Sequence, residues 1–366
     1  MKISIARETL LPALQATGNV VDRRQNLPVL GNVLVSATNN AIHLVATDLE
    51  VEVALDCSAN VAREGSVTLP AKKLLDIVRS LPADAELHID AAAGKAKVQS
   101  GRSRFTLATL PADDFPSIGN FPAIGEMEIA SSTLIELISS TFFAMAHQDV
   151  RYYLNGLLLE LSSDKLRAVA TDGHRLALCD REATVSVGAG TQLIVPRKGV
   201  QEIQRMLGHV DGTAKLVLGD NHLRISVEGQ AITTKLIDGK FPDYQRVIPK
   251  QGDKIITADR ETLRAALSRT SILSNEKFRG VRLQLAPGLL RASTHNPEQE
   301  EAEEEIEISY DGETLEIGFN VSYLLDVLGV VKSAEVRFEM SDPNSSAVIY
   351  SPEELLAKYV VMPMRL

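Results

Sequence analysis

The chain repeats itself three times at a nearly constant spacing, and this repeat limits the possible folds more than any other feature. Three landmarks recur in the same order along the 366 residues. They are a polar residue after a strand-like run (Asp48, Asp172 and Asn296), a glycine (Gly31, Gly156 and Gly280) and a strand-to-helix junction (Pro70, Pro196 and Asn320), all spaced 124 to 126 residues apart. A period this long corresponds to a whole domain, not to a solenoid unit of roughly 20 to 50 residues. We therefore expect three copies of one fold, in domains 1–124, 125–252 and 253–366.

Within each copy, a shorter pattern of one strand, one helix and three strands occurs twice. In the first copy a strand over 2–5 precedes a helix over 8–21 that places Leu10, Leu14, Thr17 and Val21 on one face. The pattern restarts with a strand at SVTLP and a helix over 71–80, and Ile5 and Val67 lie 62 residues apart. Further helices are predicted over 132–143, 197–207 and 259–271. The fold class is α+β: three tandem copies, each of two β-α-β-β-β units, with two helices and about eight strands per copy.

Net charge is −10 and is unevenly distributed among the copies. The first carries 12 basic and 13 acidic residues, the second 14 and 15, and the third 12 and 20. Taken alone, an acidic chain argues against tight electrostatic binding of nucleic acid. No apolar run approaches the ~20 residues that span a bilayer, and the N-terminus does not read as a signal peptide. Two cysteines without metal-type spacing indicate a reducing cytoplasm and no metal site.

Basic residues recur on the outer faces of helices from all three copies. In the helix over 71–80, Leu74, Leu75 and Val78 are predicted to point inward. The outer faces of the three helices carry Lys72, Asp76 and Arg79 in 71–80, Arg197, Gln201 and Arg205 in 197–207, and Arg260 and Arg264 in 259–271. For any one helix, a solvated surface is the ordinary interpretation. The helix over 132–143 is an exception, because it carries Glu136 and no basic residue. Repetition in three copies still favours another interpretation, in which these helices face a shared basic cavity within an acidic protein.

The motifs of common catalytic sites are missing from the sequence. There is no Gly-rich phosphate loop, HExxH, GxSxG or CxxC. His174 with Asp172 is the one pair to consider, and a structural turn explains it better. The Glu run at 300–305 lacks the spacing of a calcium loop. It could instead meet the basic segment KAKVQSGRSRF (95–105) of another copy, with Phe105 and Leu107 at the centre, in a head-to-tail contact.

The chain resembles the bacterial sliding clamps, the β subunits of DNA polymerase III, over its full length. The resemblance is carried by motifs that include LPVLGN (27–32), MAHQDVRYYLNG (145–156), ATDGHRLA (170–177), DGKFPDY (238–244) and YVVMPMRL (359–366). It implies a head-to-tail homodimer that forms a ring around duplex DNA without sequence preference and has no catalytic activity, cofactor or metal. It also implies partners: the replicative polymerase catalytic subunit, the clamp loader, other polymerases and repair proteins.

The resemblance assigns roles to three groups of residues in this sequence. It implies DNA contacts at Arg24, Lys72, Gln148, Tyr152, Tyr153, Arg197 and Arg205. It implies a dimer interface of Lys73, Arg102, Arg104, Phe105 and Leu107 against Ile272, Leu273, Glu300, Glu301, Glu303 and Glu304. It implies a peptide pocket at Leu154, Thr171, Gly173, His174, Arg175, Leu176, Pro242, Arg246, Val247, Val360, Val361, Met362, Pro363, Met364 and Arg365.

Two other functions remain as alternatives to a DNA-encircling clamp. One is an enzyme whose site forms at a domain junction around His174, Asp172 and Arg175. The other is a repeat scaffold that binds proteins but no DNA, in which Lys72, Arg197 and Arg205 would face solvent outside any cavity.

Overall fold

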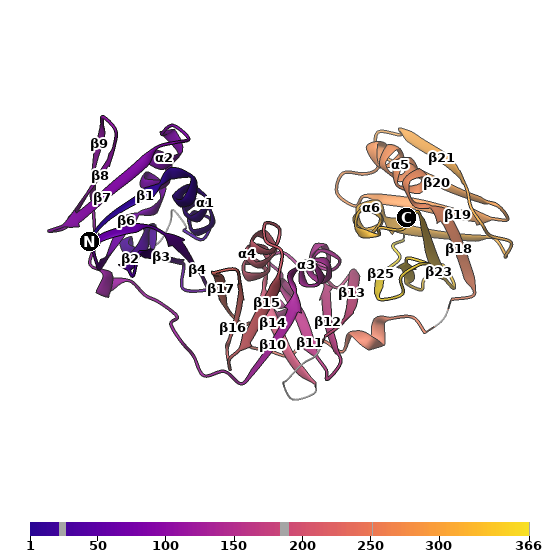
Figure 1. Ribbon diagram of the computed structural model, residues 1–366. Helices are drawn as coiled ribbons and strands as arrows, with labels where there is room; N and C mark the ends of the chain where they lie inside the picture. The colour runs from indigo at the N-terminus through magenta and orange to yellow at the C-terminus, as the bar shows by residue number, and fades with distance from the viewer. Residues whose placement is uncertain (22–26, 184–189, 251, 366) are drawn as a thin grey trace. The chain divides into compact units, whose positions relative to one another are not determined.

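The structure, a computed structural model, describes residues 1–21, 27–183, 190–250 and 252–365. Its elements follow the expected order: strand, helix and three strands occur twice in each copy (Figure 1). The one addition is a short strand, β5 (Asn60–Arg63), in the first copy. The predicted α+β fold of tandem copies is therefore confirmed.

The elements of the three copies have the following bounds. The first copy contains β1 (Lys2–Ala6), α1 (Arg7–Gly18), β2 (Asn32–Thr38), β3 (Ala41–Thr47), β4 (Val51–Ser58), β5, β6 (Gly65–Pro70), α2 (Ala71–Ser80), β7 (Glu86–Ala92), β8 (Lys95–Ser100) and β9 (Ser103–Ala108). The second contains β10 (Gly125–Ala130), α3 (Ser131–Ser139), β11 (Gly156–Leu161), β12 (Lys165–Thr171), β13 (Arg175–Glu182), β14 (Thr191–Pro196), α4 (Arg197–Leu207), β15 (Thr213–Leu218), β16 (His222–Val227) and β17 (Gln230–Lys235). The third contains β18 (Lys254–Asp259), α5 (Arg260–Thr270), β19 (Gly280–Ala286), β20 (Leu289–His295), β21 (Glu301–Glu307), β22 (Leu315–Asn320), α6 (Val321–Val330), β23 (Glu335–Met340), β24 (Ala347–Tyr350) and β25 (Ala357–Val361).

Two predicted helices were too long at their C-terminal ends. Helix α1 ends at Gly18 and not at Val21, because the glycine weakens the helix there. Helix α3 ends at Ser139, and a 3-10 turn at Phe142–Ala144 follows it. The Ser140 and Thr141 hydroxyls donate to helix carbonyls, a competition that favours helix ends. In α2, Leu75 is half-buried instead of fully inward, whereas Leu74 and Val78 are buried as predicted.

The chain forms two compact units, and every strand lies wholly within one of them. One unit comprises residues 1–134 and 198–236, the other 135–197 and 237–366. The first contains a five-stranded sheet, β5-β1-β7-β8-β9, and an eight-stranded sheet, β10-β15-β16-β17-β4-β3-β2-β6. The second contains an eight-stranded sheet, β14-β11-β12-β13-β25-β24-β23-β18, and a four-stranded sheet, β21-β20-β19-β22. Helix α1 packs on α2, and α5 packs on α6. Among the described helices, none has the length and apolar character to cross a bilayer.

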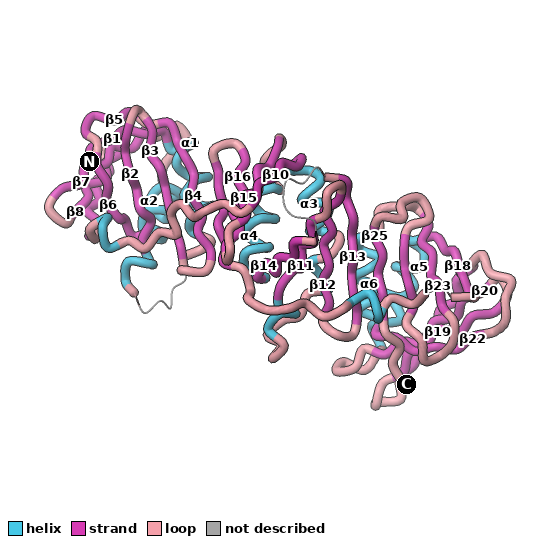
Figure 2. The backbone as a smooth tube through the Cα atoms, turned by 90° about the horizontal axis from the view of Figure 1, so that it is seen from below, coloured by secondary structure: helices cyan, strands magenta, loops and turns pink. Residues whose placement is uncertain are grey.

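The two eight-stranded sheets join successive copies by the same antiparallel pairing. In the first junction, β4 pairs with β17, with Val53 opposite Ile232. In the second junction, β13 pairs with β25, with Ala177 opposite Tyr359, and the two strands lie side by side (Figure 2). Each pair lies at the centre of its eight-stranded sheet. On the preceding strand, Val53 stands opposite Ala46 and Ala177 opposite Ala170, 124 residues apart, so the two pairs occupy equivalent positions. One backbone arrangement therefore connects copy one to copy two and copy two to copy three.

The 124-residue period is reproduced in the hydrogen bonds of the turn that follows the third strand of each copy. Asp48 Oδ1 accepts from the backbone N–H groups two and three residues later, at 2.9 and 2.8 Å. Asp172 Oδ1 does the same at 2.9 and 3.0 Å. Asn296 Oδ1 accepts from Glu300 N at 2.9 Å, across a turn one residue longer. These side chains cap a turn, as Asp and Asn commonly do.

Candidate docking, DNA-contact and interface sites

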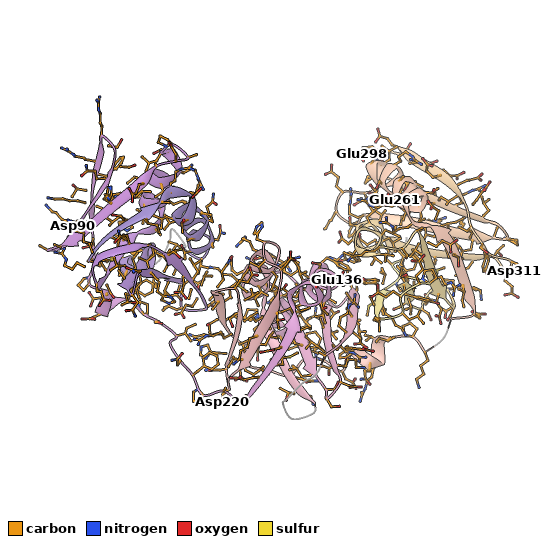
Figure 3. All side chains as sticks on the ribbon, in the orientation of Figure 1. Asp90, Glu136, Asp220, Glu261, Glu298 and Asp311 are labelled. Atoms are coloured by element: carbon orange, nitrogen blue, oxygen red, sulfur yellow. The ribbon has the colours of Figure 1, made fainter. Side chains whose placement is uncertain are left out.

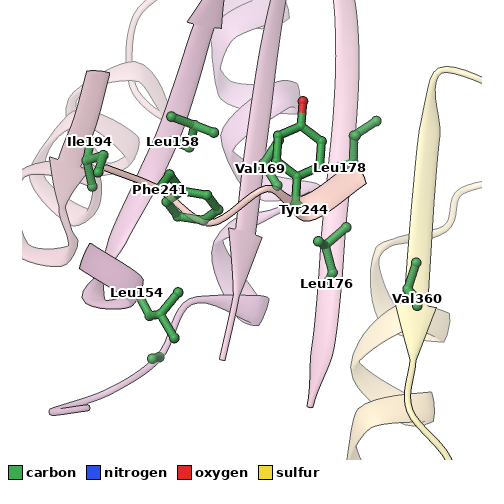
Figure 4. Close-up of a cluster of buried hydrophobic side chains, with 10 residues drawn as sticks. Leu154, Leu158, Val169, Leu176, Leu178, Ile194, Phe241, Tyr244 and Val360 are labelled. Carbon is green, nitrogen blue, oxygen red and sulfur yellow. The ribbon is translucent and has the colours of Figure 1, made fainter. Parts of the chain in front are cut away.

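The predicted peptide pocket is built on a buried apolar cluster of the second unit, shown in Figure 4. Leu154, Leu176 and Val360 of the predicted pocket all belong to it. Phe241 and Tyr244 from the segment after β17 pack on the same cluster. Four segments that are distant in sequence therefore meet here, around residues 154, 176, 241–244 and 360.

The turn that carries His174 and Arg175 is fixed by ionic and aromatic contacts. Arg175 Nε donates to Asp172 Oδ2 at 3.1 Å, and its guanidinium also pairs with Asp326 of α6. The same guanidinium lies 4.4 Å from the Tyr323 ring centroid and 5.2 Å from that of Phe143. Arg175 thus fastens the pocket turn to α6.

Glycine suits position 173, at the centre of this turn, because of its backbone conformation. Its φ of +89° lies in the left-handed region that side chains disfavour. A Cβ at this position would also come within 2.9 Å of Arg151 Nη2. The Thr171 hydroxyl donates to Arg175 O at 2.6 Å and closes the turn. Asp172 serves this turn through backbone N–H groups and the Arg175 guanidinium, which is a structural role.

A hydrogen-bonded network holds the segment 241–247 against the sheet. The Tyr244 hydroxyl donates to Glu160 and accepts from Arg167 Nη1 at 3.0 Å. Arg167 in turn forms a two-point ion pair with Asp180 at 2.6 and 2.8 Å. Burial alone would raise the pKa of Asp180, but the hydrogen bonds and charge of Arg167 outweigh it and lower that pKa.

Beyond this network, the segment offers an exposed rim. Pro242, Arg246 and Val247 are exposed, and Arg246 pairs with Asp243 at 2.8 Å. The predicted pocket residues of this segment therefore surround the buried cluster instead of belonging to it.

The C-terminal segment continues the second junction past β25. Met362 N donates to His174 O at 2.9 Å, and Met364 N donates to Gly318 O at 2.8 Å. Val360 and Val361 are buried, the next three residues are half-buried, and Arg365 is exposed. A hollow of about 820 Å³ lies beside Met364 and Arg365, with Phe278 on its wall. The half-buried methionines give the site an adaptable apolar surface.

The predicted DNA-contact loop before β11 projects apolar and aromatic side chains. Val150 is 95% exposed and Tyr152 is 56% exposed, while Tyr153 packs on the apolar cluster. Asp149 and Arg151 form a two-point ion pair at 3.0 and 2.8 Å, whose hydrogen bonds lower the pKa of Asp149 to about 2. Gln148 adopts φ +57°, so the loop reverses sharply there.

The basic residues predicted on helices differ in how freely they are presented. Lys72 is exposed on α2, whereas Arg205 pairs with Glu202. Arg197 is half-buried over the Phe142 ring, 4.6 Å from its centroid. Burial lowers the pKa of Arg197, and the charge of Arg175 adds to the effect. Arg24 lies outside the described residues.

Both predicted interface strands lie at the edge of a sheet. β9 ends the five-stranded sheet and β21 ends the four-stranded sheet. On and near β9, Lys73, Arg102 and Arg104 are exposed and Phe105 is half-buried, but Leu107 is only 7% exposed within its own chain. Near β21, Ile272 is 74% exposed and Leu273 half-buried. Glu300, Glu301 and Glu303 are exposed, whereas Glu304 already pairs with Arg269 at 2.6 Å.

Several residues of these sites were missed in the sequence. Phe241 and Tyr244 anchor the pocket, and Tyr323 and Phe143 hold Arg175. Phe241 could have been found by comparing copies, since Phe115 lies 126 residues earlier and packs in the corresponding cluster of the first copy. No sequence signal singled out Phe143 or Tyr323, because Arg175 lies 32 residues from Phe143 and in a different copy from Tyr323.

Comparison with known proteins places this architecture. Three family models match in order: the DNA polymerase III beta subunit N-terminal domain over residues 1–119, the central domain over 128–243 and the C-terminal domain over 245–365. The Beta sliding clamp of Pseudomonas aeruginosa is 53% identical and that of Escherichia coli 46% identical, each over the full length of both chains. The crystal structure of the Pseudomonas aeruginosa clamp bound to griselimycin matches with a TM-score of 0.97 at 53% identity, again over both whole chains.

These matches cover all three copies, and the family is one of non-catalytic polymerase subunits, so the enzyme alternative is wrong. The chain belongs to the DNA polymerase III beta subunit family, the beta sliding clamps that act as processivity factors in DNA replication.

Proposed function

We propose that two protomers of this chain close head to tail into a ring around duplex DNA, with β9 of each protomer paired to β21 of the other. The observation that carries this proposal is the recurrence of one strand pairing at both internal junctions. β9 is equivalent to β17 and β25, and β21 is equivalent to β4 and β13. β9 and β21 are therefore complementary edge strands. Their equivalents are paired with each other at the internal junctions, and within the described chain β9 and β21 are not. Edge strands left open invite pairing with another chain, and head-to-tail contacts close into rings when the geometry allows.

The internal junctions also predict the register between the two copies. Phe105 occupies the position of Ile232 and Tyr359, and Ala302 occupies that of Val53 and Ala177. The pairing should therefore set Phe105 opposite Ala302. One residue along on each strand, Arg104 then faces Glu303, so an apolar pair and an opposite-charge pair lie side by side.

The charges support this register. Lys95, Lys97, Arg102 and Arg104 lie on or near β9, and five of the seven residues of β21 are glutamates. Opposite charges across an interface favour the correct partner and speed association. Glu303 is exposed and forms an ion pair with Arg291 of its own sheet at 3.4 Å, which a contact with Arg104 would have to share or replace.

Weak contacts to the DNA backbone would suit a ring that moves along its track. Lys72, Gln148, Tyr152, Tyr153, Arg197 and Arg205, with Arg24, are proposed to face the duplex. Neutralising 6–10 phosphates would make binding strongly salt-dependent, by roughly 10³–10⁵ in affinity between 50 and 200 mM salt. Scattered bases on a protein of net charge −10 give weaker, sequence-blind contacts, and closure of the ring supplies retention.

The pocket is proposed to bind short peptides of the replicative polymerase catalytic subunit, the clamp loader, other polymerases and repair proteins. Its apolar cluster, exposed rim and methionines suit a ligand that presents hydrophobic side chains. Affinities near micromolar, about −8 kcal/mol, would let partners exchange.

The proposed domains span residues 1–124, 125–252 and 253–366. The proposed location is the cytoplasm, where the two unpaired cysteines would stay reduced.

Retention on circular DNA tests the proposal. The protein would be loaded onto nicked circles by a bacterial clamp loader with ATP, and half of each sample linearised before gel filtration in high salt. A topological link predicts retention on circles and release from cut ends. Equal salt-sensitive loss from both would indicate ordinary electrostatic binding. No retention beside a working control clamp would favour the protein-binding scaffold.

A charge-exchange series tests the register. We expect Arg104→Glu or Glu303→Arg alone to shift a dimer of about 79 kDa, twice the 39.7 kDa chain, toward monomer. The double variant should recover much of the dimer, as judged by sedimentation at micromolar concentration. Arg63→Glu, on the other edge strand of that sheet, is the matched control and should not alter the mass. A double variant as weak as either single one would contradict the register.

A further inference from the structure

A cavity of about 330 Å³ lies at the first junction, within the first unit. Pro12 and Ala16 of α1, with Asn19 just after it, form one wall, and Met206 of α4 forms another. Ile232 of β17 points into the same space from the junction strands. The cavity is open to solvent on one side, where Pro12, Gln15 and Asn19 are exposed, and it is bordered by three elements that the repeat also supplies at the second junction.

At the second junction the corresponding space is filled by aromatic rings. Tyr359 stands at the position of Ile232 and is only 2% exposed. Its ring centroid is 5.9 Å from that of Phe143, which lies 124 residues after Asn19. The position of Ala16 is taken at the second junction by Ser140, 124 residues later, whose hydroxyl donates to Glu136 O at 2.8 Å. Burial raises the pKa of Tyr359, so this phenol stays protonated.

The first junction lacks all three of these groups. Isoleucine replaces tyrosine, asparagine replaces phenylalanine and alanine replaces serine, and the space they leave is the cavity. An apolar cavity of about 150 Å³ is enough to hold benzene in other proteins. The second junction thus shows, within the same chain, which molecule the first junction could accommodate.

We propose that this cavity binds a small molecule carrying one phenol-type aromatic ring, seated as Tyr359 is seated at the second junction. The ring would lie on Ile232, Met206 and Ala16, and His209 and Gln15 line the same cavity for a polar substituent. Of its lining residues, Arg205 is also a proposed DNA contact and pairs with Glu202, whereas the other residues of the cavity have no proposed role. All residues of the predicted peptide pocket belong to the second unit, whereas this cavity is lined only by residues of the first.

The probe is p-cresol, the tyrosine side chain as a free molecule. We expect one saturable site per chain at millimolar or lower concentration in ligand-observed NMR, consistent with the limited affinity of so small a ligand. Ile232→Tyr should place a ring in the cavity and weaken p-cresol binding at least tenfold, while raising the melting temperature. Ile232→Val, which leaves the space open, is the matched control and should bind as the wild type does.

Three results would overturn the proposal: no saturable binding by the wild type, unchanged binding by Ile232→Tyr in a folded protein, or equal loss in the Val control. If Ile232→Tyr does not fold, Ala16→Leu fills the cavity from α1 and must give the same loss. The measurement uses the free protein without DNA, so its failure would leave the ring proposal untouched.

Discussion

The two internal junctions share one backbone arrangement but differ in the chemistry of their side chains. Glu52 faces Thr233 at the first junction, where Leu176 faces Val360 at the second. Glu52 is 5% exposed and accepts hydrogen bonds from Ser117 Oγ at 3.0 Å and Ile118 N at 2.8 Å. Leu176 belongs instead to the apolar cluster of the pocket. A strand pairing that joins copies can therefore also become a docking surface when its side chains are apolar.

The ion pairs at the turns after β3 and β12 also differ between the two junctions. At the first junction Asp48 pairs directly with Lys198 of α4. At the second, Asp172 holds Arg175, which reaches Asp326 of α6 and lies on two aromatic rings. A second group of charges, in which Glu136 (labelled in Figure 3) pairs with Lys332, is also present there. The second junction thus combines more aromatic and ionic contacts around the pocket.

Exchanging the facing residues should give the largest effect. Leu176→Glu introduces at the second junction the carboxylate that Glu52 provides at the first. There the position of Ser117, whose hydroxyl donates to Glu52, is taken by Asp243, so the new carboxylate gains no such donor. Burying an unpaired carboxylate is costly, so we expect peptide affinity to fall by more than about 100-fold, equivalent to roughly 2.7 kcal/mol.

The measurement is fluorescence anisotropy with a labelled peptide from the polymerase catalytic subunit. Thr233→Val, which changes the first junction only, is the control and should leave the affinity unchanged. Near-normal binding by a folded Leu176→Glu protein would mean that the apolar pair does not distinguish the junctions.

Removing the buried ring of the second junction should have an intermediate effect. Tyr359→Ile recreates the side chain of the first junction and leaves a cavity, at a cost of about 2–4 kcal/mol by comparison with other large-to-small core changes. Thermal unfolding followed by circular dichroism would show the loss. Ile232→Val should cost no more than about 1.5 kcal/mol. Equal costs would show that packing does not differ between the junctions.

The smallest effect concerns acid stability around the second linker. The pKa of Asp180 is lowered in the folded state, so its stabilising contribution is present above its ordinary pKa and is lost as pH falls through the folded value, below about pH 4. Asp180→Asn should cost on the order of 1 kcal/mol near neutrality and make unfolding less steep with pH below 4. If the free energy of unfolding of the variant falls below pH 4 as steeply as that of the wild type, Asp180 does not contribute to the acid sensitivity.

The repeat was predictable from sequence because its landmarks are local. Asp48, Asp172 and Asn296 cap turns within a few residues of themselves, and each copy's strand and helix order followed from apolar spacing. The pocket was harder to find, since Leu154, Leu176 and Val360 are far apart and only the fold gathers them. The short strand β5 escaped detection because its NVAR sequence is mostly exposed and carries no alternation. Helix ends were misplaced where Ser140 and Thr141 compete for backbone carbonyls.

The covalent linkers at the internal junctions have a consequence for how a ring would part. Each internal strand pair is tethered by the chain itself, which keeps its two edges at an effective concentration in the millimolar range for a short flexible linker. The pairing of β9 with β21 has no such tether and depends on the free concentration of the second copy. Strand pairs of similar intrinsic strength would therefore separate first where the chain is discontinuous. If the ring forms as proposed, its seams are the two β9–β21 pairings, and a loader that opens the ring would need to part only one of them.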